Sequence, residues 1–183
     1  MHNSLDNKYV ISEFYSFEAD RSLIKESIAN NSTITIKCIL QKADTLNRNG
    51  RVYPYKILKR EVDKYQELVN ERSAMGECDH PDSAVISLAN VSHLVTRMWW
   101  EGTTLYGEIE IAETPSGNIL KGLLKSGIKL GISSRGIGSV KNIKGSDVVQ
   151  EDFELIGFDV VSSPSTPGAY LFKEGRQWGL TKL

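Results

Sequence analysis

The sequence has 183 residues, enough for one sizeable domain with little left for a second. Hydrophobic residues make up 40% of it and charged residues 25%, which is typical of globular proteins and argues against wholesale disorder. The formal net charge of −1 argues against a surface built to neutralise many phosphates, so we expect no direct nucleic-acid partner.

Cysteine content and hydropathy indicate the setting in which the chain works. The two cysteines, Cys38 and Cys78, are too few for a disulfide framework, and a reduced, intracellular setting is expected. No run of about eighteen apolar residues occurs, and the opening MHNSLDNKYV lacks the apolar centre of a signal peptide. We therefore expect no membrane partner.

The first half of the chain predicts two strands and two helices before a polar loop. The expected elements are a strand in YVISEFYSF, a short helix in ADRSLIKESIAN, a strong strand over 32–40 and an amphipathic helix over 55–71. Between the last two, NRNGRVYPYK is a polar turn around Asn49-Gly50, and Pro54 stands where a helix begins. The segment AMGECDHPDSA is expected to be a loop because of its Gly, Asp and Pro content.

The second half of the chain is richer in strands. NVSHLVTRMWW and TTLYGEIEIA predict two strands joined by a tight turn, and 116–127 predicts a helix with a glycine stop. IKLGISSRGIGSVKN and EDFELIGFDVVSS predict further strands with KGSD as a turn, and the tail from Ser162 is expected to be irregular. Because strands outnumber helices, we predict an α+β fold with a mainly antiparallel β-barrel flanked by helices.

Two adjacent serines in LGISSRGIGS are the first candidates for chemistry. Ser134 shares a strand face with Leu130 and Ile132, whereas Ser133 lies on the other face with Arg135. If the apolar face is inward, Ser133 points outward into a groove, and the neighbouring glycines leave room for a peptide. The alternative is a solvated serine without a role, so the pattern needs a partner base.

The loop GECDHP carries the candidate base, His80. The pKa of imidazole suits proton transfer near neutral pH, and loops often carry functional residues. His2 is near a terminus and His93 lies within a strand, so His80 is preferred, although many loop histidines are exposed and idle. A zinc site from Cys78, Asp79 and His80 is not expected, because successive residues point apart and no partner pair is available. We predict neither a metal nor another cofactor.

Asp159 in LIGFDVV is the candidate acid. Phe158 and Val160 share one strand face, so Asp159 lies on the opposite face, as Ser133 does. If the intervening turn is centred near Ser146, Asp159 lies directly opposite Ser133, with Cβ atoms about 5 Å apart. A register slip of two residues remains an alternative.

Two rival acids are less suitable than Asp159. Glu154 has the parity of the inward face, and Asp79 is a chain neighbour of the histidine, which seldom allows a good hydrogen bond. The residues therefore suggest Ser133 as nucleophile, His80 as base and Asp159 as the acid that orients it.

The same region has to supply donors for an oxyanion. Arg135 and Gly136 are the candidates, because glycine lets a carbonyl come close. An esterase of the α/β-hydrolase type is a weaker alternative, because Ser133 sits in G-I-S-S-R and the G-x-S-x-G elbow is absent.

Four motifs together resemble the prohead proteases of T-even-type tailed phages. NRNGRVYP, GECDHP, MWWEGTTLYG and GISSRGIGS occur in the order and approximate spacing of that family, and the resemblance covers residues 33–170. It implies a fold like that of the herpesvirus maturation proteases, with His80 as base and Ser133 as nucleophile. Herpesvirus enzymes use a second histidine as third member, but no histidine follows His93 here, so Asp159 remains our choice.

The resemblance also implies where the protein acts and on what. It implies a serine endopeptidase inside the prohead in the infected host cytoplasm, which cleaves scaffold and shell proteins and forms a homo-oligomer. Related enzymes favour a hydrophobic residue, any residue and then Glu before the cut, so IKES (24–27) and IAET (111–114) are candidates for self-cleavage. We expect a processed N-terminal segment over 1–31, a protease domain over 32–172 and a tail over 173–183.

A structural or scaffold-associated protein that keeps the fold without the activity is the alternative from a different class. The combination of a serine, a histidine and an acid at matching parities counts against it, because a purely structural protein does not need those three groups. Cleavage of partner proteins discriminates the two hypotheses.

Overall fold

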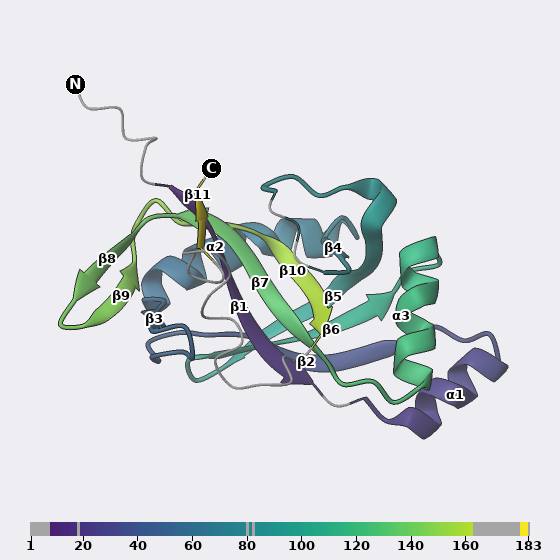
Figure 1. The fold of residues 1–183 in the computed structure, drawn as a ribbon. Coiled ribbons are helices and arrows are strands. Elements are labelled where there is room, and N and C mark those ends of the chain that lie inside the picture. Colours follow the sequence, from purple (N-terminus) through teal and green to yellow (C-terminus); the bar gives the residue numbers. More distant parts are fainter. Residues whose placement is uncertain (1–7, 18, 80, 82, 163–179, 183) are drawn as a thin grey trace.

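The computed structural model describes residues 8–17, 19–79, 81, 83–162 and 180–182. Within these residues the strands form two four-stranded sheets and a small three-stranded sheet (Figure 1). The first sheet has the order β10-β7-β1-β11, with strands at Glu154–Ser162, Leu130–Gly138, Tyr9–Phe17 and Leu180–Lys182. The second has the order β2-β6-β5-β4, with strands at Thr35–Lys42, Thr104–Ile111, Val91–Glu101 and Met75–Glu77. The third has the order β3-β9-β8, with strands at Arg51–Val52, Ser146–Val149 and Val140–Ile143.

Helices lie around these sheets. They are α1 (Arg21–Ala29), α2 (Tyr55–Asn70), α3 (Pro115–Lys125) and the short 3₁₀-helix η1 (Leu88–Asn90). The helix α1 begins after Asp20, whose carboxylate accepts hydrogen bonds from the first turn, and α3 begins after Thr114, whose hydroxyl does the same. Figure 1 shows α1 beside α3 at one end of the molecule and the β8–β9 hairpin projecting at the other.

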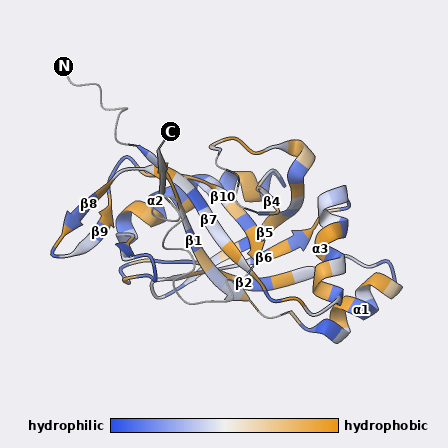
Figure 2. Ribbon diagram, in the orientation of Figure 1, coloured by the Kyte–Doolittle hydropathy of each residue, from blue (hydrophilic) through white to orange (hydrophobic). Residues whose placement is uncertain are grey.

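The core lies between the two larger sheets and α2. Along β2, Ile36, Cys38 and Leu40 are buried, whereas Thr35 and Lys37 are exposed, as period-two alternation requires. Figure 2 shows hydrophobic and hydrophilic residues alternating along the strands. The helix α2 contributes a buried apolar stripe of Ile57, Leu58, Val62, Tyr65 and Val69.

The closed barrel predicted from the strand content is wrong. Among the described residues, hydrogen-bonded pairing stops at β10 and β11 in one sheet and at β2 and β4 in the other. The two sheets are linked by an isolated parallel bridge between Cys78 and Val160, next to which the Asp79 N–H donates to the Val160 carbonyl at 2.9 Å. The fold is α+β with mostly antiparallel sheets. Alternation predicts which face of a strand is buried, but it does not predict which edges pair.

A short strand, β3, lies in NRNGRVYPYK, which was expected to be a turn, and two more lie in segments that were expected to be irregular. The strand β4 forms inside AMGECDHPDSA and pairs with β5, and β11 forms in the tail and pairs with β1. Each has three residues, which is too short for an alternation pattern. Both β4 and β11 form because they pair with the edge of a neighbouring strand.

The longer elements agree with the predictions. The helix expected over 55–71 is α2 at Tyr55–Asn70, and the two strands joined near Glu101-Gly102 are β5 and β6. Within the described ranges, no helix combines the length and the apolar character needed to cross a membrane.

Candidate active site

Ser133 and Asp159 lie directly opposite each other on the antiparallel strands β7 and β10, as the register argument predicted. Nearer the β8–β9 hairpin, Glu154 pairs with Ile137, a register that would place Phe158 opposite Ser133. A bulge between Leu155 and Gly157 shifts the pairing by one residue and brings Asp159 to that position. The β8–β9 turn is centred between Lys144 and Gly145, because Ile143 pairs with Ser146, and not near Ser146 as expected. The opposition therefore depends on the bulge and on the break between the hairpin and the longer strands.

The assignment of faces is also confirmed. Leu130, Ile132, Phe158 and Val160 belong to the hydrophobic core. Residues of the other parity, Ser133 and Asp159 among them, are directed away from this core.

The expectation that Ser133 points into an open groove is wrong. Its exposed fraction is 0%, and among the described residues its Oγ makes only a long hydrogen bond of 3.5 Å, to the Ser134 carbonyl. The segment after β4 lies on this side of the sheet, because the Ser83 carbonyl accepts a hydrogen bond from Arg135 Nη1 at 2.8 Å. The serine is thus on the predicted face but enclosed.

Ser134 belongs to a buried polar chain on the core side. Its Oγ accepts a hydrogen bond of 2.8 Å from Gln41 Nε2, and Gln41 Oε1 accepts one of 2.7 Å from the Tyr15 hydroxyl. Ser134 therefore holds β2 and β1 to β7.

A buried charge cluster of Glu77, Arg135 and Asp159 lies on the face of Ser133. Arg135 Nη2 donates to Glu77 Oε2 at 2.7 Å and to Asp159 Oδ1 at 3.1 Å, while its Nε lies 2.9 Å from Asp159 Oδ2. The exposed fractions of the three side chains are 0 to 1%. The Glu77 N–H also donates to Asp159 Oδ1, at 3.1 Å. The Arg135 guanidinium thus holds the carboxylate of the candidate acid in place.

The charge cluster carries two carboxylates and one guanidinium. Burial raises the pKa of Asp159 to about 7, although Arg135 acts in the opposite direction. Glu77 Oε1 has no hydrogen-bond partner within the described part of the chain and is inaccessible to solvent. An unpaired buried carboxylate oxygen is costly, and such atoms are few in folded proteins.

His80 and His2 lie outside the described residues, but chain neighbours of His80 are described. Before it, the Asp79 N–H donates to Val160, the residue after Asp159, and the backbone of Asp79 has a φ of 67°. After it, Ser83 is bonded to Arg135. Both flanks of the candidate base are therefore attached to the strands that carry the candidate nucleophile and acid.

His93 is a structural histidine. It is fully buried on β5, its Nε2 lies 2.8 Å from the Phe158 carbonyl, and its Nδ1 lies 2.8 Å from Ser92 Oγ. Because a carbonyl only accepts, Nε2 carries the proton and Nδ1 accepts from the serine hydroxyl. Burial lowers the pKa of His93 to about 4, so the ring is neutral at physiological pH. Both ring nitrogens of His93 therefore have hydrogen-bond partners within the fold.

We expect His93 to make the fold sensitive to mild acid. The unfolded chain binds a proton at His93 near pH 6.5, whereas the folded chain does so only near pH 4. Stability from this residue is thus complete above pH 6.5 and falls by about 3 kcal/mol as the pH is lowered to 4. Urea unfolding of wild type and His93→Gln across this range measures it. The variant should be less stable at pH 7 but lose less stability on acidification, and parallel curves would contradict the assignment.

The space over two glycines of β7 is occupied by aromatic side chains of the same chain. The expectation that these glycines leave room for a peptide is therefore wrong. A Cβ built at Gly131 would lie 2.1 Å from a ring atom of Phe14, and one built at Gly136 would lie 2.3 Å from a ring atom of Phe153. These glycines allow aromatic rings to pack on the strand.

Comparison with known proteins shows the family of the chain. A family model described as prohead core protein serine protease matches residues 18–175. The chain belongs to this family.

Two individual relatives extend the comparison within the prohead protease family. The prohead core protein protease of Enterobacteria phage T4 is 36% identical over 141 residues, which cover 74% of this chain and 66% of that protein. A solved structure, that of the bacteriophage T4 capsid assembly protease gp21, matches with a TM-score of 0.74 and 27% identity, covering 86% of this chain and 99% of that one. The chain thus spans about two thirds of the length of the curated relative.

One buried cluster in this prohead protease family member was not recognised in the sequence. Glu13 of β1 is buried, and it contacts side chains of NRNGRVYP, a motif to which we assigned only a structural turn. Burial raises the pKa of Glu13, and Arg51 opposes this shift. The signal was present: in YVISEFYSF the glutamate has the same parity as Ile11 and Phe17, which are core residues. An acid at a core position indicates a dedicated partner.

Proposed function

We propose that this chain is a serine endopeptidase that cleaves scaffold and shell proteins, and itself, inside an immature phage capsid. Membership of the prohead core protein serine protease family supports the proposal. The observation that carries it is the opposition of Ser133 and Asp159, with both flanks of His80 attached to the same two strands.

In the proposed mechanism, Ser133 Oγ attacks the scissile carbonyl while His80 takes its proton. The imidazolium then gives the proton to the leaving amine, and water hydrolyses the acyl-enzyme in a second cycle of the same kind. Asp159 holds the ring in the tautomer that accepts from the serine and stabilises its charged form.

The oxyanion donors are proposed to come from Arg135 and Gly136. The Arg135 guanidinium is occupied by two carboxylates, so we assign this role to the main-chain N–H groups of the two residues. The bulge in β10 lies opposite them, and a bulge interrupts the hydrogen-bonded ladder locally. This supports the availability of a main-chain donor there.

We further propose that the fold is herpesvirus-protease-like, that the chain forms a homo-oligomer and that assembly in the prohead opens the site. The burial of Ser133 supports a required opening, because no peptide reaches a fully enclosed hydroxyl. The division into 1–31, 32–172 and 173–183 remains a prediction. We note that β1 pairs along its full length with β7.

Self-cleavage is proposed at one of two bonds. The bond after Glu26 lies within α1, so this helix has to unwind locally before the chain can enter an active site in extended form. The bond after Glu113 directly precedes Thr114, the N-cap of α3. Mass spectrometry of active protein with an intact N-terminus would remove the first of these sites.

The triad is tested by incubating variants with the scaffold and shell proteins of the same phage. His80→Ala should abolish cleavage, and Asp159→Asn should lower kcat by about 10⁴-fold, because the wrong tautomer of the base is then favoured. Glu154→Gln is the matched control, since Glu154 is an exposed acid on the same strand. Gel electrophoresis and mass spectrometry of the products measure the rate per folded molecule.

Two outcomes would overturn the proposal. An active His80→Ala with an inactive but folded His93→Gln would refute the choice of base. Wild-type protein that never cleaves a partner within assembled proheads would favour the alternative, a catalytically inactive structural or scaffold-associated protein.

A further inference from the structure

We infer that Glu13 is a positioning residue, whose carboxylate sets the register of β1 against the strand that carries Ser133. It does so through three side chains of NRNGRVYP, which we call the Glu13 receptor: Asn49, Arg51 and Tyr53. The inference rests on the proposed function, in which Ser133 is the nucleophile.

The Glu13 receptor engages both carboxylate oxygens. Asn49 Nδ2 donates to Oε2 at 2.6 Å, and the Tyr53 hydroxyl donates to Oε1 at 3.1 Å. Arg51 Nε lies 2.6 Å from Oε1, and the exposed fractions of the arginine and the glutamate are 4% and 2%. A buried carboxylate held by a cation and two neutral donors fits one position only, because each donor requires its own direction.

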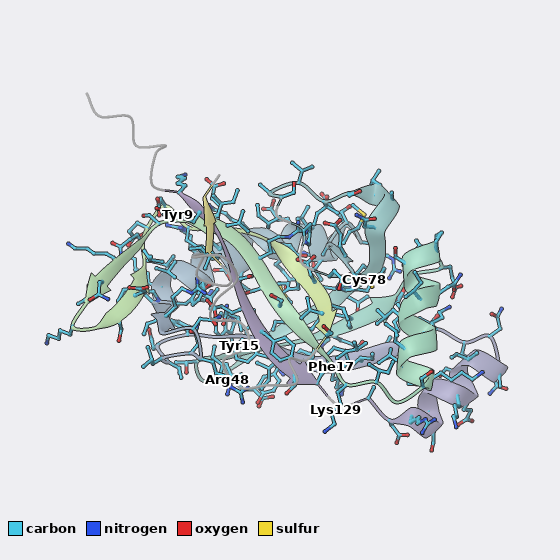
Figure 3. All side chains as sticks on the ribbon, in the orientation of Figure 1. Tyr9, Tyr15, Phe17, Arg48, Cys78 and Lys129 are labelled. Carbon is cyan, nitrogen blue, oxygen red and sulfur yellow. The ribbon has the colours of Figure 1, made fainter. Side chains whose placement is uncertain are left out.

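The Glu13 receptor and the apolar pattern of β1 exclude different errors in the register of this strand. Ile11 and Phe17 are core residues with the parity of Glu13, and Tyr9, of the same parity, packs against the core. Figure 3 labels Tyr9, Tyr15 and Phe17 along the strand. A slip of one residue would turn all of them to the other face, so the apolar pattern alone excludes it. A slip of two keeps the pattern, but it brings Ile11 or Tyr15 to Arg51. The buried ion pair between Arg51 and Glu13 would then be broken, which is strongly destabilising.

The register decides which side chain lies beside the nucleophile. Phe14 pairs with Ser133, and its ring packs on the bare backbone of Gly131 two residues before. After a slip of two residues, Ser12 or Ser16 would replace Phe14 there. By anchoring its own side chain on the core face, Glu13 therefore holds Phe14 against Ser133 on the opposite face.

The test is Glu13→Gln in the full chain, compared with Glu13→Gln/Arg51→Gln. The single variant removes the ion pair between Glu13 and Arg51, and kcat should fall about tenfold or more with a smaller change in KM, because small misplacements of reacting groups are costly. The rate at which a fluorophosphonate labels Ser133, per folded molecule, should fall in parallel. The double variant removes both charges of this ion pair and should recover stability, but both rates should stay low because the carboxylate that anchors β1 is still absent. If Glu13→Gln does not fold, Arg51→Lys keeps the charge without the planar fork and should show an intermediate loss.

Glu110→Gln is the control. Glu110 lies on β6 in the other four-stranded sheet and also forms an ion pair with an arginine, Arg72. Its variant should change neither kcat nor the labelling rate. The inference is overturned if folded Glu13→Gln keeps the wild-type kcat and labelling rate, or if Glu110→Gln loses as much activity. An active Ser133→Ala would instead refute the proposed function.

Discussion

Ser133→Ala is expected to abolish cleavage, lowering kcat by about 10⁴-fold or more, because the nucleophile of the proposed triad is removed. Its folding should be nearly unchanged, since the Ser133 hydroxyl makes a single long hydrogen bond within the part of the chain that the structure describes. The measurement is cleavage of the scaffold and shell proteins, followed by gel electrophoresis and mass spectrometry. Labelling by a fluorophosphonate should disappear with the activity.

Ser134→Ala is the internal control for this result. It removes the acceptor of the Gln41 amide, and an unpaired buried donor should cost about 1–3 kcal/mol of unfolding free energy. The activity per folded molecule should stay within a few-fold of wild type. An inactive, folded Ser134→Ala together with an active Ser133→Ala would show that the two roles are reversed.

Arg135→Met should cause a large loss of stability. It leaves Glu77 and Asp159 buried side by side without their cation, and breaking a buried ion pair in this way costs about 3–5 kcal/mol. Without the arginine, burial and mutual repulsion favour the protonated carboxyl groups, so the loss should shrink as the pH is lowered from about 8 to about 5. Urea unfolding at both pH values measures this.

Two companion variants show whether the loss comes from the charge cluster. Arg135→Met/Glu77→Gln should recover part of the stability, because the Glu77 charge is removed and Asp159 is the only one of the two carboxylates left without the arginine. Arg72→Met removes an exposed arginine paired with Glu110, and it should stay within about 1 kcal/mol of wild type. A loss for Arg135→Met that is small, or equal at both pH values, would contradict the account of a charged cluster.

Most of the elements were predictable because their patterns are long. The helix α2 has an apolar stripe over four turns, and β2 alternates between buried and exposed residues. The barrel was wrongly predicted because closure depends on which edges meet. The strands β4 and β11 were missed because each is defined by a neighbour rather than by its own residues.

The candidate site was predictable in part. Parity placed Ser133 and Asp159 on one face, and turn arithmetic placed them opposite each other. The arithmetic assumed a turn centred near Ser146, whereas the observed turn is centred between Lys144 and Gly145. It also did not include the bulge at Ile156, without which Phe158 would occupy the place of Asp159. A bulge has no pattern of its own, because one inserted residue changes neither composition nor hydropathy.

Periodicity acts over neighbouring residues, so the amino-acid pattern was enough to predict the helices and long strands, the apolar faces of the strands, and a serine and an acid on the non-apolar face. The enclosure of Ser133, the contacts of Arg135 with Glu77 and Asp159, and the contact of Glu13 with NRNGRVYP became evident only in the folded chain. Those contacts join segments far apart in the chain. A buried charge needs a partner, but which residue is that partner depends on the folded arrangement and not on the neighbouring sequence.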